Sequence, residues 1–169
     1  MRELDKFIEE VERLKSITMA FSENGRHANA DGVICPEKYF YSPLKITWIL
    51  QESYGDGSAD QPSQRNACSI LSDFGSEGYK TFRPIVSLPY ILKTGIEYYP
   101  GLEDTEDAYN MFRETTSYIN IKRVPDLGSE TTNKFNDWAL KEENAKLLLE
   151  QLKCYAPDII ISEFFTLLY

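Results

Sequence analysis

Three short apolar runs, far apart along the chain, constrain the fold of this protein more than any other feature of its sequence. Residues 46–50, 117–121 and 158–162 are short, mostly apolar and rich in β-branched side chains. Strands that are covered on both faces of a sheet have this pattern. Helical patterns separate the runs, and such alternation is typical of crossovers between parallel strands. We therefore predict that the three runs form adjacent parallel strands.

Apolar side chains recur at three- and four-residue spacing on either side of these runs. The two longest predicted helices cover residues 3–20 and about 136–155, and we expect both to pack on the sheet. Asn24 and Gly25 end the first helix, and Pro157 stops the second. The inner face of the second helix is expected to carry Trp138, Leu140, Ala145, Leu148, Leu149 and Leu152.

Shorter elements complete the predicted fold. Helices are predicted at residues 67–74, 84–95 and 103–115, and loops at 30–43, 53–66 and 124–133. The fold class that this pattern indicates is α/β, a three-layer α/β/α sandwich with a small parallel sheet. A length of 169 residues suits one domain, and no linker or repeat divides it, so we predict a single domain over residues 1–169.

Composition narrows the classes of partner. Asp and Glu number 27 against 18 Lys and Arg, which gives a net charge of -9. Proteins that bind nucleic acids are usually basic, because Lys and Arg release counterions from the phosphates. The charge as a whole therefore opposes a polyanionic partner, although a local basic groove is compatible with it.

Cysteine and histidine are too few and too scattered for a disulfide framework or a structural zinc site. The chain has Cys35, Cys68, Cys154 and a single histidine, His27, with no Cys-x-x-Cys motif. The N-terminus does not have the pattern of a signal peptide, and no apolar stretch approaches the roughly 18 residues of a membrane span. We expect a reduced, cytoplasmic protein with no cofactor, no metal and no membrane association.

Candidate site residues follow the predicted strands. Ligands bind beyond the carboxyl ends of parallel strands. Gln51, Glu52 and Tyr54 come after the first strand, and Asn120 and Lys122 come at the end of the second. An amide reads a donor and acceptor edge, an aromatic ring supplies a wall, and a carboxylate positions a water molecule. Together these groups suit a small planar polar ligand.

Each of these residues also has an ordinary structural interpretation. Gln51 and Glu52 are typical of helix caps and loops, and Asn120 is typical of turns. Paired basic residues after a strand, here Lys122 and Arg123, are more often solvated than bound to a phosphate. The residues alone leave both interpretations open.

Two of these segments resemble known motifs. Leu50-Gln51-Glu52-Ser53-Tyr54-Gly55 is similar to the first active-site motif of the uracil-DNA glycosylase superfamily, Gly-Gln-Asp-Pro-Tyr-His. Tyr118-Ile119-Asn120-Ile121-Lys122 resembles the second-strand motif of that superfamily, in which an Asn ends a strand and a Lys often follows. The apolar strand after Pro157 also resembles the strand that follows a helix in those enzymes. The resemblance covers roughly residues 44–162.

The resemblance implies a role for each matching residue. Gln51 provides backbone amide contacts, and Glu52 stands where the family has its water-activating Asp. Tyr54 walls the pocket against the thymine methyl group, and Asn120 hydrogen-bonds the uracil edge, with Lys122 also in the substrate site. The implied activity is that of a DNA glycosylase, an N-glycosyl hydrolase that acts on a flipped uracil in DNA.

The sequence departs from the family in four ways. Glu52 replaces an Asp, Ser53 replaces a Pro, and only Phe74 is a candidate for the aromatic residue that stacks on the base. The third motif of the family, a His-Pro-Ser type loop, has no counterpart before Tyr169, and His27 precedes the first strand. We therefore expect weak or no uracil excision. The alternative is a non-catalytic α/β module that binds a nucleobase-like small molecule or a protein partner.

Overall fold

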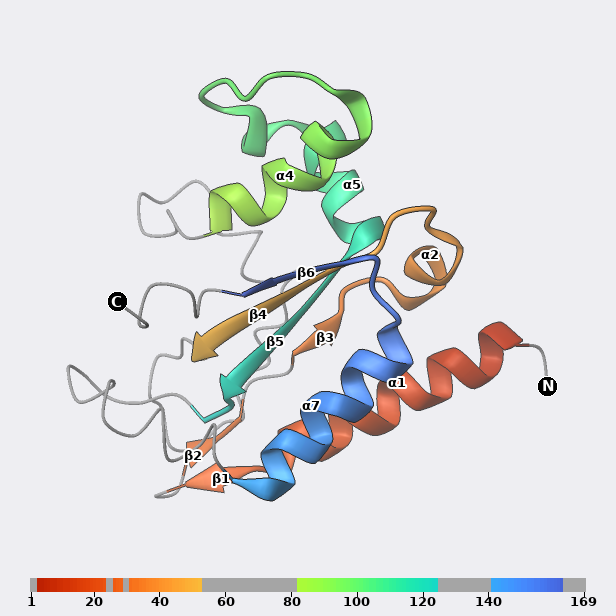
Figure 1. Cartoon of the computed structure of the whole chain (residues 1–169), viewed down its shortest axis with the longest axis vertical. Helices are drawn as coiled ribbons and strands as arrows, with labels where there is room; N and C mark the ends of the chain where they lie inside the picture. Colours follow the sequence, from red (N-terminus) through yellow and green to blue (C-terminus); the bar gives the residue numbers. More distant parts are fainter. Residues whose placement is uncertain (1–2, 24–25, 29–30, 53–81, 125–140, 163–169) are drawn as a thin grey trace.

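The structure is a computed structural model that describes residues 3–23, 26–28, 31–52, 82–124 and 141–162. In this part of the chain it is a mixed α/β fold, in which helices lie on both faces of a four-stranded sheet (Figure 1). A separate two-stranded ladder joins β1 (Ser22–Glu23) to β2 (Arg26–His27) in antiparallel pairing. The α/β class predicted from the sequence is confirmed.

The three predicted strands are present, and β4 (Ile46–Glu52) lies between the other two. It pairs in parallel with β5 (Thr116–Lys122) on one side and with β6 (Ile159–Ser162) on the other. Parallel pairing is therefore confirmed. The order of the sheet is β3-β5-β4-β6, so β5 and β6 do not contact each other as ladder neighbours.

The fourth strand corrects the prediction of a purely parallel sheet. Strand β3 (Gly32–Val33) pairs with β5 in antiparallel register, with Gly32 opposite Tyr118. It lies in the segment 30–43 that we predicted to be a loop, together with helix α2 (Pro36–Tyr41). Two residues of strand are too few for alternation to be recognised in a sequence. The short helix begins at a proline, which suits the first turn because no N–H is needed there.

Two groups of helices cover the two faces of the sheet. Helices α1 (Glu3–Met19) and α7 (Glu142–Tyr155) lie side by side on one face, and α2 packs against α1 (Figure 1). Helix α4 (Phe82–Thr94), the 3-10 turn η1 (Leu102–Asp104) and α5 (Glu106–Thr115) lie over the other face.

Most helix predictions agree with these bounds. The segments 3–20 and 84–95 correspond to α1 and α4, and 103–115 divides into η1 and α5. The division occurs at Thr105, whose hydroxyl accepts a hydrogen bond from the N–H of Ala108 and caps α5. Helix α7 ends at Tyr155, where Ala156 adopts a left-handed conformation ahead of Pro157.

Other predictions fall on residues that the structure does not describe. The first helix ends at Met19, and Asn24 and Gly25 lie outside the described residues. So do the predicted helix at 67–74, the loop at 53–66, residues 136–140 of the last helix and all but the first residue of the loop at 124–133.

Alternation along the strands separates two cores. Ile46, Trp48 and Leu50 of β4 pack with Tyr118 of β5 and with α4 and α5, whereas Ile119 packs with α1, α2 and α7. Successive residues of β5 therefore face opposite layers. Asn120 and Lys122 follow Tyr118 on the α4 side, and Arg123 continues the α7 side.

Candidate functional site at the carboxyl edge of the sheet

The parallel register brings the two resembling motifs to one edge of the sheet. Leu50 pairs with Asn120, and Glu52 pairs with Lys122. The backbones of both predicted site segments are therefore neighbours at the carboxyl ends of β4 and β5. The side chains of Gln51 and Glu52 and the whole of Tyr54 lie outside the described part of the structure, so their convergence on one pocket stays a prediction.

Asn120 is a strand residue and is almost completely buried, with 5% of its surface exposed. Our interpretation of it as a turn residue is therefore wrong. Its main-chain N–H donates to Oδ2 of Asp31 at 2.9 Å. Among the described residues, no hydrogen bond involves its carboxamide group. The main-chain N–H of Asn120 is thus bound to Asp31, whereas the NH₂ donor and the oxygen acceptor of its side chain bind none of the described residues.

Asp31 reaches Asn120 because the β3–β5 ladder stops there. Gly32 is the first residue of β3 and pairs with Tyr118, and Asp31 precedes it in the chain. The buried N–H of Asn120 therefore donates to the side-chain carboxylate of Asp31. In a longer edge strand, a main-chain carbonyl would be the acceptor. Sequence reasoning missed Asp31, because a single Asp in an irregular segment has no distinguishing pattern.

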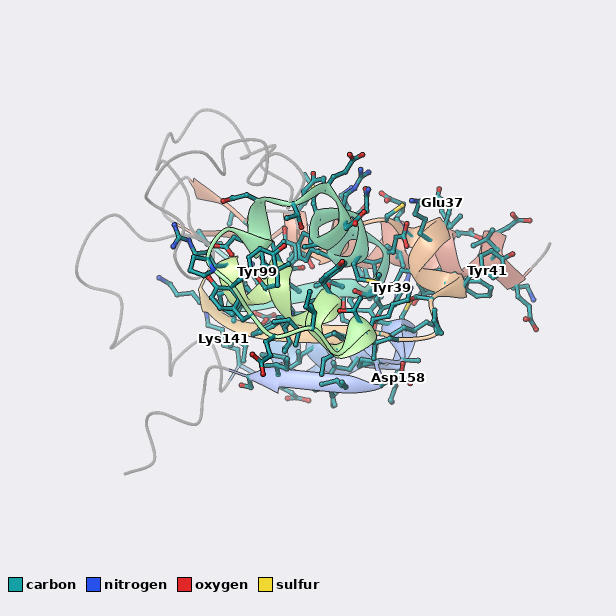
Figure 2. All side chains as sticks on the ribbon, turned by 90° about the horizontal axis from the view of Figure 1, so that it is seen from above. Glu37, Tyr39, Tyr41, Tyr99, Lys141 and Asp158 are labelled. Carbon is teal, nitrogen blue, oxygen red and sulfur yellow. The ribbon has the colours of Figure 1, made fainter. Side chains whose placement is uncertain are left out.

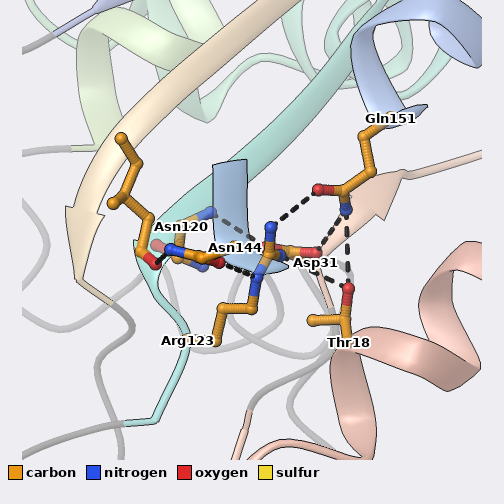
Figure 3. Close-up of polar contacts among 7 residues, drawn as sticks. Thr18, Asp31, Asn120, Arg123, Asn144 and Gln151 are labelled. Atoms are coloured by element: carbon orange, nitrogen blue, oxygen red, sulfur yellow. Dashed lines mark hydrogen bonds and ion pairs between the residues drawn. The ribbon is translucent and has the colours of Figure 1, made fainter. Parts of the chain in front are cut away.

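Arg123 is held by polar groups on three sides within the protein (Figure 3). Its Nη1 lies 3.1 Å from Oδ2 of Asp31, its Nε donates to Oδ1 of Asn144 at 2.8 Å, and its Nη2 donates to Oε1 of Gln151 at 3.0 Å. Arg123 and Lys122 are both buried, so our interpretation of this basic pair as solvated is wrong. A buried guanidinium needs such partners because leaving water removes its hydration.

Further bonds connect this cluster to helix α1 and back to β5. Nε2 of Gln151 donates to Oδ1 of Asp31 at 3.1 Å and to Oγ1 of Thr18 at 3.5 Å. Nδ2 of Asn144 donates to the carbonyl oxygen of Ile121 at 2.7 Å. We call Thr18, Asp31, Arg123, Asn144 and Gln151 the buried polar cluster. It joins α1, β5, α7 and the residue before β3.

The electrostatics of the cluster centre on one carboxylate and one guanidinium. Burial raises the pKa of the Asp31 carboxyl, and the charge of Arg123 is the strongest influence against that rise. The hydrogen bonds from Asn120 and Gln151 act in the same direction as Arg123. The ionised form of Asp31 therefore depends on its partners.

Helix α7 supplies the cluster through a face that agrees only in part with the predicted one. The buried residues of α7 are Asn144, Leu147, Gln151 and Tyr155, whereas Leu149 is 55% exposed. The predicted inner face is confirmed for Leu148 and Leu152, which pack against this core, and wrong for Leu149 and Ala145, which are exposed. Trp138 and Leu140 lie outside the described residues. Asn144 and Gln151 are seven positions apart, a spacing that places both on one face of a helix. This spacing was the signal in the sequence that could have identified the polar face of α7.

The described residues give no sign of a metal site or of a membrane span. No three His, Cys, Asp or Glu side chains among them are grouped in a way that would hold a metal ion. None of the described helices has the length and apolar character needed to cross a bilayer. Comparison of the chain with protein-family models, with curated proteins and with solved structures finds no significant match.

Proposed function

We propose that the carboxyl edge of β4 and β5 binds a nucleobase of the uracil type, as in the glycosylase superfamily that the two motifs resemble. The observation that carries this proposal is the position of Asn120. It is buried two residues before the end of β5, it is paired with Leu50 directly before Gln51 and Glu52, and its carboxamide has no partner among the described residues.

A carboxamide in this position is chemically suited to the edge of uracil. Its NH₂ group donates to a carbonyl oxygen, and its oxygen accepts from the ring N–H beside that carbonyl. A site that hydrogen-bonds such an edge discriminates strongly against ligands that lack it, because its buried polar groups are otherwise left unpaired. Lys122, buried two positions further along β5, lies on the same side of the strand as Asn120.

The reaction class proposed with this site is hydrolysis of the glycosidic bond, with Glu52 as the residue that positions water. We expect it to be slow. Glu52 is one methylene longer than the Asp of the family motif, and a displacement of about 1 Å in a catalytic group costs about a hundredfold in rate.

A second candidate function uses the same residues without catalysis. It is the binding of a free nucleobase or nucleoside, and surface charge favours it over binding to DNA. Exposed cations such as Arg13, Lys38 and Lys146 each lie within 2.9 Å of a carboxylate oxygen, and the net charge is -9. Cations that are already paired attract phosphates weakly.

Two measurements on the purified protein test the proposal. Uracil is titrated in by calorimetry, and abasic sites are counted after incubation with uracil-containing single- and double-stranded DNA at low salt. The key variant is Asn120→Asp, which preserves size and the main-chain N–H but replaces the NH₂ donor by an acceptor. We expect it to weaken uracil binding about tenfold or more, which corresponds to the loss of one buried hydrogen bond of about 1.4 kcal/mol.

The matched control is Asn110→Asp on helix α5, which makes the same change in charge away from the carboxyl edge. It should bind uracil as the wild type does. Glu52→Gln separates the two candidate functions, because it should abolish slow excision while leaving uracil binding in place. Absence of both binding and excision in the wild type, or equal binding by the two Asn→Asp variants, would overturn the proposal.

A further inference from the structure

We propose that Asp31 is a positioning residue for the recognition of the nucleobase by Asn120. This inference rests on the proposed function and adds to it a residue that neither motif contains. Asp31 lies 89 positions before Asn120 in the chain, yet its Oδ2 accepts the main-chain N–H of Asn120 at 2.9 Å.

The bond holds the main-chain N–H of Asn120 on the side of β5 that faces β3. On its other side, β5 is held by the parallel ladder to β4, in which Asn120 pairs with Leu50. Among the described residues, strand β3 pairs with β5 as far as Gly32, which lies opposite Tyr118. The carboxylate of Asp31 therefore completes the support of β5 at the residue whose side chain is proposed to contact the base.

Asp31 is itself held in one orientation. Oδ1 accepts from Gln151 at 3.1 Å, and Oδ2 is shared between Asn120 and Arg123, whose Nη1 lies at 3.1 Å. Both charged side chains are buried, with 0% exposure for Arg123 and 1% for Asp31 (Figure 3). A carboxylate that is fixed on both oxygens transmits its position to the N–H that it binds.

Recognition of a base edge depends on such support. A side chain that reads hydrogen bonds must be held within about 0.5 Å of its productive position, and second-layer contacts provide this. Without Asp31, the end of β5 gains freedom, and the Asn120 carboxamide fits the edge of uracil less well. The expected result is a loss of discrimination as well as a loss of affinity.

The protein contains a matched control for this interaction at the other end of the sheet. Oδ2 of Asp158 accepts the main-chain N–H of Lys45 at 2.8 Å, just before β4 begins. Figure 2 shows Asp158 at the end from which β6 starts, away from the edge toward which the strand arrows point. Asp158→Ala therefore removes the same kind of bond at a distance from the proposed site.

The test compares the affinity for uracil with that for 3-methyluracil, in which a methyl group blocks the ring N–H that Asn120 is proposed to read. The ratio of the two dissociation constants reports edge recognition. Partial unfolding lowers the binding of both ligands alike and leaves the ratio unchanged. We expect Asp31→Ala to reduce the preference for uracil about tenfold, and Asp31→Asn, which retains a weaker neutral acceptor, to reduce it about threefold. Asp158→Ala should retain the wild-type ratio.

A double variant tests whether Asp31 acts through Asn120. In the Asn120→Asp background, Asp31→Ala should cause no further loss of preference, since the group that Asp31 positions has already been changed. The inference would be overturned, while the proposed function stands, if Asp31→Ala and Asp31→Asn both retain the wild-type ratio of dissociation constants. If Asp31→Ala does not fold, a wild-type ratio in Asp31→Asn has the same meaning. A wild type that binds neither ligand would overturn both.

Discussion

Asp31 and Arg123 form an ion pair inside the protein, with 3.1 Å between Oδ2 and Nη1 and almost no exposure of either side chain. The two residues are 92 positions apart. Taking two such charges out of water is costly. The hydrogen bonds that Asp31 accepts from Asn120 and Gln151, and those that Arg123 donates to Asn144 and Gln151, offset part of that cost. The pair therefore joins the beginning of β3 to the end of β5. A substitution of either residue should be costly in stability, because it leaves the other charge buried without its partner.

Replacing Arg123 by Met should be among the most destabilising single changes in the described part of the chain. It leaves the buried carboxylate of Asp31 without its counter-charge, which costs about 3–5 kcal/mol. Arg13→Met is the matched control, because Arg13 pairs with Glu10 and Glu150 at the surface, where ion pairs contribute about 0–1 kcal/mol. Urea unfolding measures both, and equal losses of stability in the two variants would contradict the prediction.

The stability of Arg123→Met should depend on pH more than that of the wild type. Burial raises the pKa of the Asp31 carboxyl, and Arg123 opposes this rise, so the variant has a still higher pKa for Asp31 in the folded state. A raised folded-state pKa gives stability that is present below the unfolded-state pKa of about 3.9 and is lost as the pH rises through the folded-state pKa. We therefore expect the loss of stability in Arg123→Met, relative to the wild type, to be smallest near the unfolded-state pKa of about 3.9 and to grow toward neutral pH. A deficit that is constant across this range, measured by urea unfolding, would argue against the assignment.

Gly32→Ala should destabilise the protein more than Gly95→Ala. Both glycines have positive φ angles, of 125° and 71°, so an alanine is strained at either position. At Gly32 a Cβ would also lie 2.8 Å from Oη of Tyr155, whereas at Gly95 it would meet no atom of the described residues within 4 Å. We expect a difference of about 1–3 kcal/mol in the free energy of unfolding.

Tyr155→Phe provides the check on that interpretation, since it removes the hydroxyl oxygen that the new Cβ would meet. In the Gly32→Ala background it should restore part of the lost stability. No recovery in the double variant would show that the backbone conformation, and not the contact with Tyr155, determines the cost.

Cys154 should react slowly with alkylating reagents across the ordinary pH range. Burial raises the pKa of its thiol to about 11. Because only the thiolate reacts, the rate should rise about tenfold per pH unit from pH 7 to 9.5 without a plateau. Iodoacetamide labelling followed by peptide mass spectrometry measures this rate, and a plateau near pH 8.5 would contradict the raised pKa.

The main elements of the fold were predictable because they depend on short-range patterns. The apolar runs in β4, β5 and β6 and the helical periodicity of α1 and α4 are properties of a few neighbouring residues. Their parallel arrangement followed from the alternation of strands and helices. Asn120 and Lys122 could be proposed as site residues for the same reason, since each comes at the end of a recognisable strand.

The amino-acid sequence by itself thus determined the apolar elements and the edge of the sheet where β4 and β5 end together. Only the tertiary structure decided that Arg123 is buried, that β3 pairs with β5, and that α7 turns Asn144 and Gln151 inward in place of Leu149. The physical reason is that an apolar side chain favours burial against almost any apolar neighbour. A buried charge is tolerated only where specific partners from distant segments meet it, as Asp31 meets Arg123.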